Sequence, residues 1–466
     1  MSSNNRLLHL GIGAFHRGHQ AYYLHLLNQQ LPESERWFYT SINLRKETQA
    51  MPAQLKQQSG QYHLKRIAPN GDTTYLKIEA IDRIEDASER PAVIAQLFAE
   101  RQTKAATITV TEGGYYLTED DNLNLDHAEI KHDLAATKNA ANAPLTLYGF
   151  LAAGLLARYH ANAGPITVLS CDNLRDNGQK LKRAFEQFLI HANLDSLKQW
   201  TSENVRFPCS MVDRITPIPP DSLIEEIQTQ LKETDYCPVL GEDFQQWVIE
   251  NNLTHPFPPL EKVGVIITDD VYIYEEAKIR VLNGGHFLLC YVAALRGYEY
   301  FHQAIQDAEL QQWLKQYHCD EVFPTLPNTP FDIEAYRQTI VSRFSNPHIA
   351  DSVARITADS ISKFPQFILP TLARSLAMGH MPTAAIRLLA HWYCFLVLVA
   401  SGRLQFNYQD AYFPLVKQWL DQPDPAIAFL DEKAIWSETT TQYPEFRERL
   451  YTALVSTFNS YGEQYP

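Results

Sequence analysis

The sequence predicts an α/β domain in the N-terminal half of the chain, followed by an all-helical domain. At 466 residues the chain is too long for one ordinary hydrophobic core, which favours two domains. Up to about residue 270, short apolar runs alternate with amphipathic helical stretches, as in a mostly parallel sheet with right-handed crossovers. Beyond that point the apolar residues recur at helical spacing only. We therefore expect the two domains to cover residues 1–270 and 271–466.

The first domain opens with an apolar run that ends in glycines and leads into a helix up to about residue 28. Its expected strands cover residues 7–13, 37–44, 106–111, 165–171 and 265–268, and its clearest helices cover residues 90–101, 145–161 and 178–190. The turn signal Asn70-Gly-Asp72 separates two alternating runs, residues 62–66 and 73–78. This pattern predicts a β-hairpin inserted into the domain.

The second domain is predicted to contain helices only. They are expected at residues 275–297, 302–318, 333–344, 366–378, 383–401 and 409–422. The most apolar segment, residues 384–400, is interrupted by Arg387 and His391 and is too short to span a bilayer. We expect it to be a buried core helix.

Composition excludes several classes of function. The formal net charge of −14 disfavours a nucleic-acid or anionic-membrane partner. The six cysteines are scattered and form no Cys-x-x-Cys pair, which fits reduced thiols and argues against a structural zinc site. The polar N-terminus carries no export signal. We expect a cytoplasmic protein, and a monomer because no interaction helix or repeat is evident.

Gly11 and Gly13 follow the first expected strand and precede a helix. Strand, Gly-x-Gly and helix open a Rossmann-type dinucleotide-binding unit, in which the first glycine permits the turn and the second admits a pyrophosphate. Position 16, where the usual third glycine would stand, is histidine. In the first helical turn, His16 and Arg17 are either phosphate ligands or surface cations.

The end of the second expected strand normally decides between NAD and NADP. An acid there holds the ribose hydroxyls of NAD, and a cation suits the additional phosphate of NADP. The sequence is Ser41-Ile-Asn-Leu-Arg45, followed by Lys46, so no acid is present. The local chemistry leans slightly to NADP or to no preference, although Asn43 has an amide suited to a ribose hydroxyl.

Two further expected strands end in polar residues. Thr111 and Glu112 follow one strand, and Asn173 follows another. The carboxyl ends of parallel strands are where such sheets place their sites, so these side chains are candidates for cofactor or substrate contacts. The alternative is that each is a turn or cap residue.

The stretch from Tyr274 to His286 combines a base, an amide and an imidazole on one expected helix. On an ideal helix at about 100° per residue, Asn283 lies roughly 140° from Lys278, with His286 between them at roughly 80°. The side chains of Lys278, Asn283 and His286 are then expected to point into one cleft. There they form a plausible site for binding a hydroxyl or carbonyl group of a substrate. The alternative is a charged, solvated first turn followed by a buried helix.

Alcohol oxidation needs a group that accepts the hydroxyl proton. The Cys and His pattern of a catalytic zinc is absent. Tyr274 and Lys278 have the Tyr-x-x-x-Lys spacing of short-chain enzymes, but those enzymes carry the pair inside the nucleotide-binding domain of a much shorter chain. A lysine acting directly requires a pKa about three units below its usual 10.4, a difference of about 4 kcal/mol. Burial or a nearby cation supplies such a shift.

The chain resembles the polyol-specific long-chain dehydrogenases and reductases, the mannitol dehydrogenase family, over nearly its whole length. The matching motifs occur in the family's order: Gly11-Ile-Gly-Ala-Phe-His-Arg-Gly-His19, Thr109-Val-Thr-Glu-Gly-Gly-Tyr115, Ser170-Cys-Asp-Asn173, Met211-Val-Asp-Arg-Ile-Thr-Pro217, Lys278-x4-Asn283-x2-His286, Arg343-Phe-Ser-Asn-Pro-His-Ile349, and Arg355 with Ser362-Lys-Phe-Pro365. Gly241-Glu-Asp-Phe244 and Glu261-Lys-Val-Gly264 are most similar to the D-arabinitol 4-dehydrogenase branch.

The resemblance implies a role for each matched residue. Lys278 is the catalytic base and no metal takes part; Asn173 and Asn283 hold the reacting oxygen as an alkoxide; His286 bonds the same or the neighbouring hydroxyl. Asp213 and Glu275 are acids near the site, and Arg355 and Lys363 bind substrate hydroxyls. The expected cofactor contacts are Gly11, Gly13, Ala14, Phe15, Arg17, Asn43, Thr111 and Glu112.

These implications predict a metal-independent polyol dehydrogenase with its active site in the cleft between the domains. The pairs expected are D-arabinitol with D-xylulose, or D-mannitol with D-fructose. The D-arabinitol-like branch is linked to NAD, which favours NAD over NADP. The alternatives are a hexuronate reductase of the same family, with Arg355, Arg280 or Arg343 as the carboxylate ligand, and a dinucleotide-sensing regulator that has lost catalysis. The retained Lys278, Asn173, Asn283 and His286 argue against the regulator.

Overall fold

A computed structural model describes residues 5–48, 50–136 and 143–465. The chain forms two compact units. The first unit comprises Met1–Ala68 and Asp72–Tyr272, and the second comprises Pro69–Gly71 and Ile273–Pro466. The predicted α/β and all-helical classes are confirmed for the two halves of the chain.

The first unit is built on a six-stranded parallel sheet with the strand order β5-β2-β1-β6-β7-β8. Its strands are β1 (Arg6–Leu10), β2 (Phe38–Asn43), β5 (Ile81–Asp86), β6 (Thr103–Ile108), β7 (Ile166–Ser170) and β8 (Val205–Arg206). From β1 the chain builds the sheet towards β5, and it then returns to the other side of β1 with β6. The boundary between β1 and β6 is therefore the topological switch point, where sheets of this kind bind ligands.

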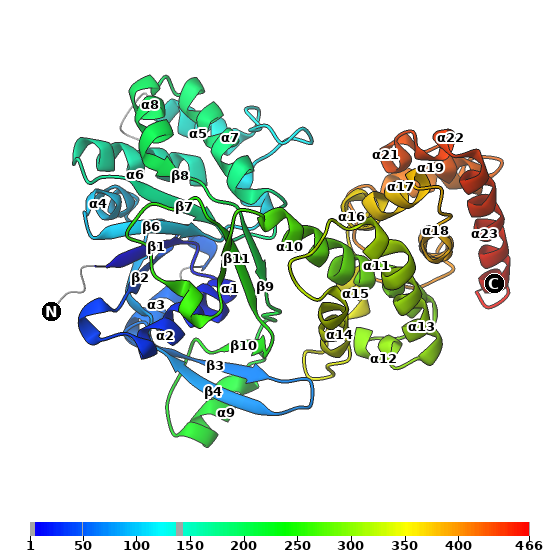
Figure 1. Ribbon diagram of the computed structural model, residues 1–466, viewed down its shortest axis with the longest axis horizontal. Helices are drawn as coiled ribbons and strands as arrows, with labels where there is room; N and C mark the ends of the chain where they lie inside the picture. Colours follow the sequence, from blue (N-terminus) through cyan, green and yellow to red (C-terminus); the bar gives the residue numbers. More distant parts are fainter. Residues whose placement is uncertain (1–4, 49, 137–142, 466) are drawn as a thin grey trace. The chain divides into compact units, whose positions relative to one another are not determined.

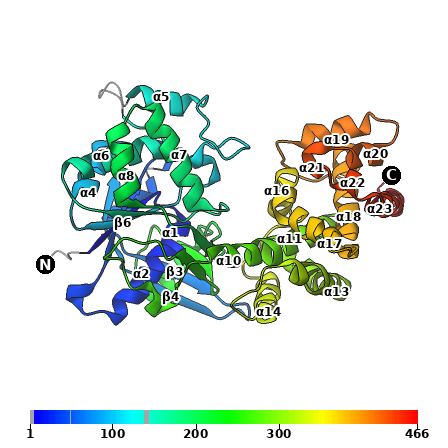
Figure 2. The ribbon, with the colours of Figure 1, turned by 45° about the horizontal axis from the view of Figure 1, so that its top comes forward.

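Helices cover both faces of this sheet (Figures 1 and 2). All of β1 is buried: Leu8 and Leu10 belong to one apolar cluster and Leu7 to the other, as alternation along a strand requires. One cluster packs under α4 (Ala92–Ala99), α6 (Leu147–His160) and α7 (Asn177–His191), and the other under α2 (Gln20–Gln30) and α3 (Ala50–Gln57). The remaining helices of this unit are α1 (Ala14–Gly18), α5 (Ala128–Ala136), α8 (Asp195–Asn204) and α9 (Ser222–Leu231).

The predicted hairpin is present and is extended by a third strand. β3 (Tyr62–Ile67) and β4 (Thr73–Ile78) pair antiparallel, and β10 (Val239–Glu242) pairs parallel to β3. A further small sheet contains β9 (Ser210–Asp213), β11 (Gln246–Glu250) and β12 (Ile266–Thr268). The expected strand at residues 265–268 is thus β12, which pairs with β11 and not with the main sheet.

The strand predicted at residues 106–111 is displaced towards the N-terminus. β6 ends at Ile108, because the backbone N–H groups of Val110 and Thr111 donate to the carboxylate of Asp172 and turn away from the ladder. The side chain of Asp172 therefore sets the end of the strand, which strand propensity alone does not reveal.

The named secondary-structure elements of the second unit, among its described residues, are all helices joined by loops. Its elements are α10 (Val271–Ala277), η5 (Lys278–Asn283), α11 (Gly284–Leu295), α12 (Phe301–Ile305), α13 (Ala308–Gln316), η6 (Tyr317–Val322), η7 (Phe323–Thr325), α14 (Ile333–Phe344), α15 (Val353–Thr357), α16 (Ser360–Phe367), α17 (Leu369–Ala377), α18 (Thr383–Ala400), α19 (Phe413–Leu420), α20 (Pro425–Leu430), α21 (Lys433–Trp436), α22 (Thr439–Gln442) and α23 (Pro444–Gly462). The helix predicted at residues 302–318 is divided, since Asp307 caps a new helix by accepting from the N–H of Glu309.

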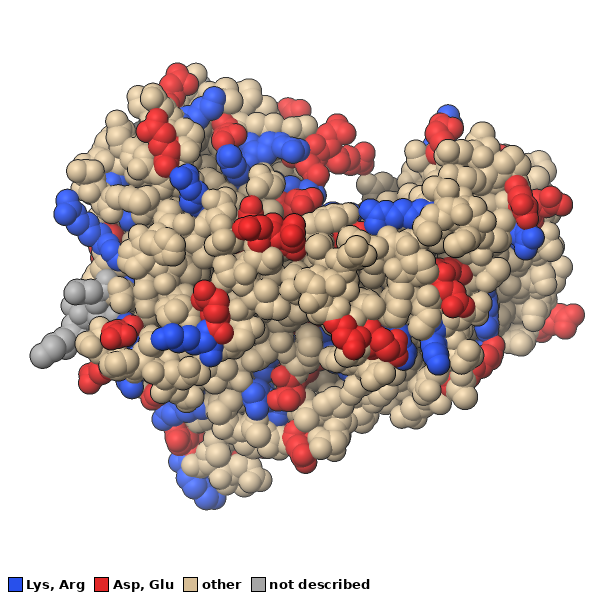
Figure 3. All heavy atoms as spheres, in the orientation of Figure 1, with Lys and Arg blue, Asp and Glu red and all other residues tan. Residues whose placement is uncertain are grey.

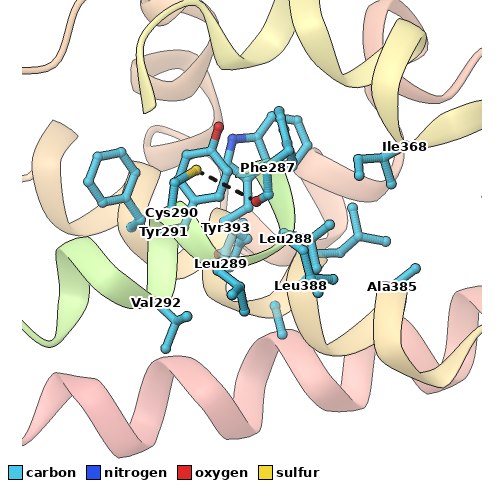
Figure 4. Close-up of a cluster of buried hydrophobic side chains, with 14 of the residues drawn as sticks. Phe287, Leu288, Leu289, Cys290, Tyr291, Val292, Ile368, Ala385, Leu388 and Tyr393 are labelled. Carbon is cyan, nitrogen blue, oxygen red and sulfur yellow. Dashed lines mark hydrogen bonds between the residues drawn. The ribbon is translucent and has the colours of Figure 1, made fainter. Parts of the chain in front are cut away.

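Helices α11 and α18 form the core of the second unit. Figure 4 shows Phe287, Leu288 and Tyr291 of α11 close to Leu388 and Tyr393 of α18 in a continuous apolar cluster. Helix α18 is the one described helix long and apolar enough to be a candidate membrane span, and most of its apolar window is buried in the unit. The prediction of a buried core helix at this segment is confirmed.

Acidic and basic side chains are interspersed over the face that Figure 3 displays. Neither unit shows a continuous field of one sign on that face, although the whole chain carries a net charge of −14. On the displayed face the acidic residues are therefore spread over the surface, with Lys and Arg between them.

Candidate active site

Gly11 and Gly13 stand at the carboxyl end of β1 for different reasons. Gly11 has φ +101°, and a Cβ atom there would lie 1.9 Å from the carbonyl oxygen of Thr109. Gly13 has φ −81°, which any residue adopts, and among the described residues beyond its chain neighbours no atom lies within 4 Å of the Cβ it would carry. The fold requires glycine at position 11 but not at position 13, so the space beside Gly13 suits the close approach of a bound ligand to the backbone.

The residues after Gly13 begin helix α1. Ala14 and Phe15 are half-buried in its first turn, and the Phe15 ring stacks on His19 with centroids 4.9 Å apart. Ala14 and Phe15 therefore lie directly beside the glycine loop, which is where the predicted contacts with the cofactor place them.

His16 and Arg17 are not surface cations, because both side chains are buried and bonded within the chain. The His16 ring is fully buried, stacks on His9 with centroids 3.5 Å apart, and its Nε2 bonds Ser41 Oγ at 2.9 Å. Burial lowers the pKa of both imidazoles, that of His9 to about 3. The guanidinium of Arg17 is buried, donates to the carbonyl of Cys237 and lies over the ring of Tyr62. These contacts contradict the predicted role of Arg17 as a cofactor ligand. Its guanidinium instead holds the base of the glycine loop through Cys237 and Tyr62.

Asn43 is the last residue of β2, the position where a ribose-binding residue is expected. Its side chain is 3% exposed; Nδ2 donates to the carbonyl of Arg45 at 2.8 Å and to Asp86 Oδ2 at 3.2 Å, while Oδ1 accepts from Thr48 Oγ at 2.7 Å. Asn43 thus shapes the loop after β2. The acid that sequence reasoning missed at this edge is Asp86, the last residue of β5, because the charged run Ile81–Asp86 gave no strand signal.

Thr111 and Glu112 lie exposed in the turn after β6, beside the glycine loop of β1. Gly113 follows them, and apart from its chain neighbours no atom in the part of the chain that the structure describes lies within 4 Å of the Cβ it would carry. Asn173 is exposed just beyond the end of β7, and Asp213 is the buried last residue of β9. The carboxyl ends of β1, β2, β6 and β7 therefore bring the predicted residues of the first unit to one edge of the main sheet, except Asp213, which belongs to the separate sheet of β9, β11 and β12.

In the second unit, Lys278, Asn283 and His286 lie on one uninterrupted helix formed by α10, η5 and α11. The helix from Lys278 to Asn283 is a π-helix, in which the N–H of Gly284 donates to the carbonyl of Ile279. The angular offset calculated for an ideal α-helix is therefore wrong, since each hydrogen bond spans one residue more. Such π turns within α-helices are frequent at functional sites.

The widened turn is buried and anchored. Lys278 is 7% exposed and Glu275 is also buried. The fully buried Arg280 donates to the carbonyl of Thr325 at 2.8 Å and to Thr371 Oγ1 at 2.9 Å, and it lies 3.6 Å from the carboxylate of Glu276. Arg280 therefore serves the interior of the helix bundle.

Two glycines and a histidine accommodate the π turn. A Cβ at Gly284 would lie 3.1 Å from the hydroxyl of Tyr317, and one at Gly285 would lie 3.1 Å from His318 Nε2. His318 Nε2 bonds the carbonyl oxygen of Val281, inside the turn, at 3.0 Å. Burial lowers the pKa of His318 to about 3, so the imidazole is neutral and donates this bond.

Acidification is expected to weaken the second unit through His318. The neutral imidazole is favoured in the folded state, so its contribution is complete above the unfolded pKa of 6.5 and is lost as pH falls below it. The loss is about 1.4 kcal/mol per pH unit, or about 3 kcal/mol at about pH 4.5. His318→Gln, which keeps a donor but no titrating ring, should lose correspondingly less between about pH 7 and pH 4.5 in urea unfolding. An equal loss in both proteins would contradict this.

The other predicted substrate residues occupy different parts of the helical unit. The imidazole of His286 lies against Phe344 and Phe301, with centroids 4.2 and 4.7 Å away, which fixes its orientation. Arg355 is exposed on α15 and pairs with Asp351, a contact that raises its pKa. Lys363 on α16 donates to the carbonyl of Ala358 at 2.6 Å, and burial lowers its pKa.

No group of three or more His, Cys, Asp or Glu side chains suited to a metal ion occurs within residues 5–48, 50–136 and 143–465. All six cysteines are unpaired. Metal independence itself stays a prediction.

Both halves of the chain match descriptions of one protein family. The mannitol dehydrogenase Rossmann domain matches residues 5–262, and the mannitol dehydrogenase C-terminal domain matches residues 270–457. The chain is 40% identical to a D-arabinitol 4-dehydrogenase of Ralstonia nicotianae over 432 residues, which cover 92% of each chain. It is 35% identical to a D-arabinitol 4-dehydrogenase of Klebsiella pneumoniae, over 94% of this chain and 95% of the relative.

Solved structures agree in fold. The mannitol 2-dehydrogenase of Pseudomonas fluorescens, in a ternary complex with NAD and D-mannitol, superposes with a TM-score of 0.82 and 32% identity, covering 98% of this chain and 92% of that one. A D-sorbitol dehydrogenase in substrate-free form gives a TM-score of 0.86 at 29% identity, with 98% and 93% covered.

Proposed function

This chain belongs to the mannitol dehydrogenase family, and we propose that it is an NAD-dependent dehydrogenase interconverting a linear sugar alcohol and its ketose. The observation that carries the proposal is the match of both family domains over nearly the whole chain, with Lys278, Asn283 and His286 all retained on one helix. D-arabinitol with D-xylulose is the leading pair, and D-mannitol with D-fructose is the second.

The first unit fits a dinucleotide. The open space beside Gly13 and Gly113, on neighbouring strand ends at the switch point, is where a dinucleotide lies against the backbone in this class of fold. Gly11, Gly13, Ala14, Phe15, Asn43, Thr111 and Glu112 are the residues proposed to hold it. When bound, the nicotinamide supplies the hydride acceptor. The exposed Arg45 and Lys46 keep NADP as the alternative.

The proposed chemistry on the chain's side is proton transfer and oxyanion stabilisation. Lys278 accepts the hydroxyl proton as the carbinol is oxidised, and returns it in the reverse direction. Asn283 and Asn173 donate amide hydrogen bonds to the oxygen as it becomes negative, and His286 bonds the same or the neighbouring hydroxyl. Asp213 and Glu275 remain proposed relay or tuning acids, and Arg355 and Lys363 remain proposed substrate contacts.

A hexuronate reductase would need a cation for the carboxylate of its substrate, and the structure weakens two of the three candidates. Arg280 is fully buried and engaged with Thr325 and Thr371. Arg355 is already paired with Asp351, which leaves Arg343 as the remaining candidate. A polyol substrate, which needs no such cation, is therefore favoured.

A substrate panel tests the proposal. Initial rates are measured for D-arabinitol, D-mannitol and D-sorbitol with NAD⁺ and NADP⁺ in parallel, and for fructuronate reduction with NADH and NADPH. We expect kcat/KM to be highest for D-arabinitol with NAD⁺, at least about tenfold above the same polyol with NADP⁺, a difference of about 1.4 kcal/mol. Preferred turnover of fructuronate would establish the reductase instead, and higher rates with NADP⁺ would overturn the cofactor assignment.

We also propose a monomeric, cytoplasmic enzyme without a nucleic-acid or membrane partner. Support comes from the six unpaired cysteines, which suit a reducing compartment, and from the net charge of −14.

A further inference from the structure

We propose that Asp172 is a positioning residue whose carboxylate holds the Thr111 turn in the strained conformation that nucleotide binding requires. This inference rests on the proposed function, because it concerns how the first unit presents its dinucleotide site. It assigns to Asp172 a role distinct from that of its neighbour Asn173, the proposed oxyanion ligand.

Thr111 carries an unusual backbone conformation. Its φ and ψ are 65° and 164°, a region that glycine occupies readily and that a β-branched residue avoids. Such a conformation is strained and persists only where surrounding contacts impose it. The turn at Thr111 therefore needs an identifiable restraint.

The restraint is the buried carboxylate of Asp172, at the end of β7. Oδ1 accepts from the backbone N–H of Thr111 at 2.9 Å and of Val110 at 3.1 Å, and Oδ2 lies 3.0 Å from the same Val110 nitrogen. Oδ2 also accepts from the hydroxyl of Tyr115 at 2.8 Å. The consecutive backbone N–H groups of Val110 and Thr111, together with the hydroxyl of Tyr115 at the far end of the turn, thus bind to one side chain.

This carboxylate chemistry is specific. Two backbone donors and one hydroxyl donor converge on two oxygens, which an ionised carboxylate accepts and an amide, with one oxygen, does not. Burial, with a smaller contribution from the nearby Glu112 carboxylate, raises the pKa of Asp172 to about 6; the hydrogen bonds from Val110, Tyr115 and Thr111 limit the shift, and the group is still ionised near pH 7. Hydrogen bonds to a charged group are stronger than those between neutral groups, so the three donors that converge on Asp172 offset the strain at Thr111.

The turn that Asp172 holds borders the glycine loop. Thr109 Oγ1 donates to the carbonyl of Gly11 at 2.9 Å, the N–H of Thr109 donates to the carbonyl of Leu10 at 2.9 Å, and Gly11 packs against the carbonyl of Thr109. Beyond Thr111, Gly113 faces open space like Gly13. Displacement of the Thr111 turn would therefore change the shape of the edge where the dinucleotide is proposed to bind.

The experiment is a double-mutant cycle read by NADH affinity. Asp172→Asn, Thr111→Gly and the double variant are compared with the wild type by NADH fluorescence titration and by thermal unfolding. We expect Asp172→Asn to weaken NADH binding at least about tenfold. In the Thr111→Gly background the same change should cost less than about threefold, since glycine adopts the turn without restraint. Equal costs in both backgrounds, or wild-type affinity in Asp172→Asn, would overturn the inference.

Two further variants keep the test decisive. Should Asp172→Asn not fold, Tyr115→Phe removes one donor to the carboxylate and is expected to weaken NADH binding about threefold in the wild type but not beside Thr111→Gly. Asp133→Asn is the matched control: Asp133 is a buried acid of the same unit that accepts from the backbone N–H groups of Leu145 and Thr146. It should lower the unfolding temperature without changing NADH affinity.

The outcomes separate the two proposals. A wild-type protein that does not bind NADH would overturn the proposed function and this inference with it. Variants that bind NADH but show no coupling between positions 172 and 111 would overturn the inference alone. If Asp133→Asn lost as much NADH affinity as Asp172→Asn, the effect of Asp172 would be one of general stability. That result would also overturn the inference.

Discussion

Replacement of Lys278 by alanine is expected to reduce kcat for polyol oxidation by about 10²–10⁴-fold while leaving the affinity for NADH within about twofold of the wild type. A positioned general base contributes a factor of this size to the rate of proton transfer. A water molecule in place of the buried amine would be a weaker base and would not restore that rate. Cofactor affinity should be retained, because the residues proposed to hold the dinucleotide belong to the first unit and Lys278 to the second.

The control for this experiment is Lys315→Ala. Lys315 is an exposed lysine of α13 in the same unit, and its replacement should change neither kcat nor unfolding by more than about 0.5 kcal/mol. Thermal unfolding separates a catalytic loss from a folding defect. Near-normal turnover in a folded Lys278→Ala variant would exclude Lys278 as the base.

Gly11→Ala is expected to lower the stability of the fold, whereas Gly13→Ala is expected to lower the affinity for NADH. At position 11 the new methyl group would lie 1.9 Å from the carbonyl oxygen of Thr109, on a backbone with φ +101°. We expect a loss of more than about 3 kcal/mol in unfolding free energy. At position 13 the methyl group meets no atom of the described residues beyond its chain neighbours, so stability should change by less than about 1 kcal/mol. It would occupy the space proposed for the dinucleotide, so NADH affinity should fall at least about tenfold.

Urea unfolding and NADH titration on the same two variants provide the measurement. Each variant serves as the control for the other, because both changes add one methyl group to the same loop. A Gly13→Ala protein that binds NADH like the wild type would show that the open space beside Gly13 is not the cofactor site.

Periodicity predicted the elements that are regular and uniformly buried. Helix α14 was placed at its observed bounds, and α6, α7, α18, β1 and β7 within a few residues, because their apolar spacing is strong. The strand β5 and the third strand of the hairpin sheet were missed. Their residues are charged or short, and pairing with a distant strand decides their conformation.

The site was predictable as a set of residues but not as a set of contacts. The residue types and spacing of Lys278, Asn283 and His286 are visible in the sequence, whereas the π turn that displaces them depends on distant contacts such as that of His318 with Val281. Arg17 illustrates the converse error, since a cation in the first turn after a glycine loop looks like a phosphate ligand until its contact with Cys237 is seen. Long-range hydrogen bonds carry this information, and local sequence does not.

The most direct test of the proposed activity is to quantify both products of one reaction. The purified wild-type protein is incubated with D-arabinitol and NAD⁺, NADH is followed by absorbance, and the sugar product is identified and quantified by chromatography. The account predicts NADH and ketose in a one-to-one ratio, with D-xylulose as the ketose. It would be contradicted if no linear polyol supported NADH formation in the wild-type protein, or if NADH appeared without an equivalent of ketose.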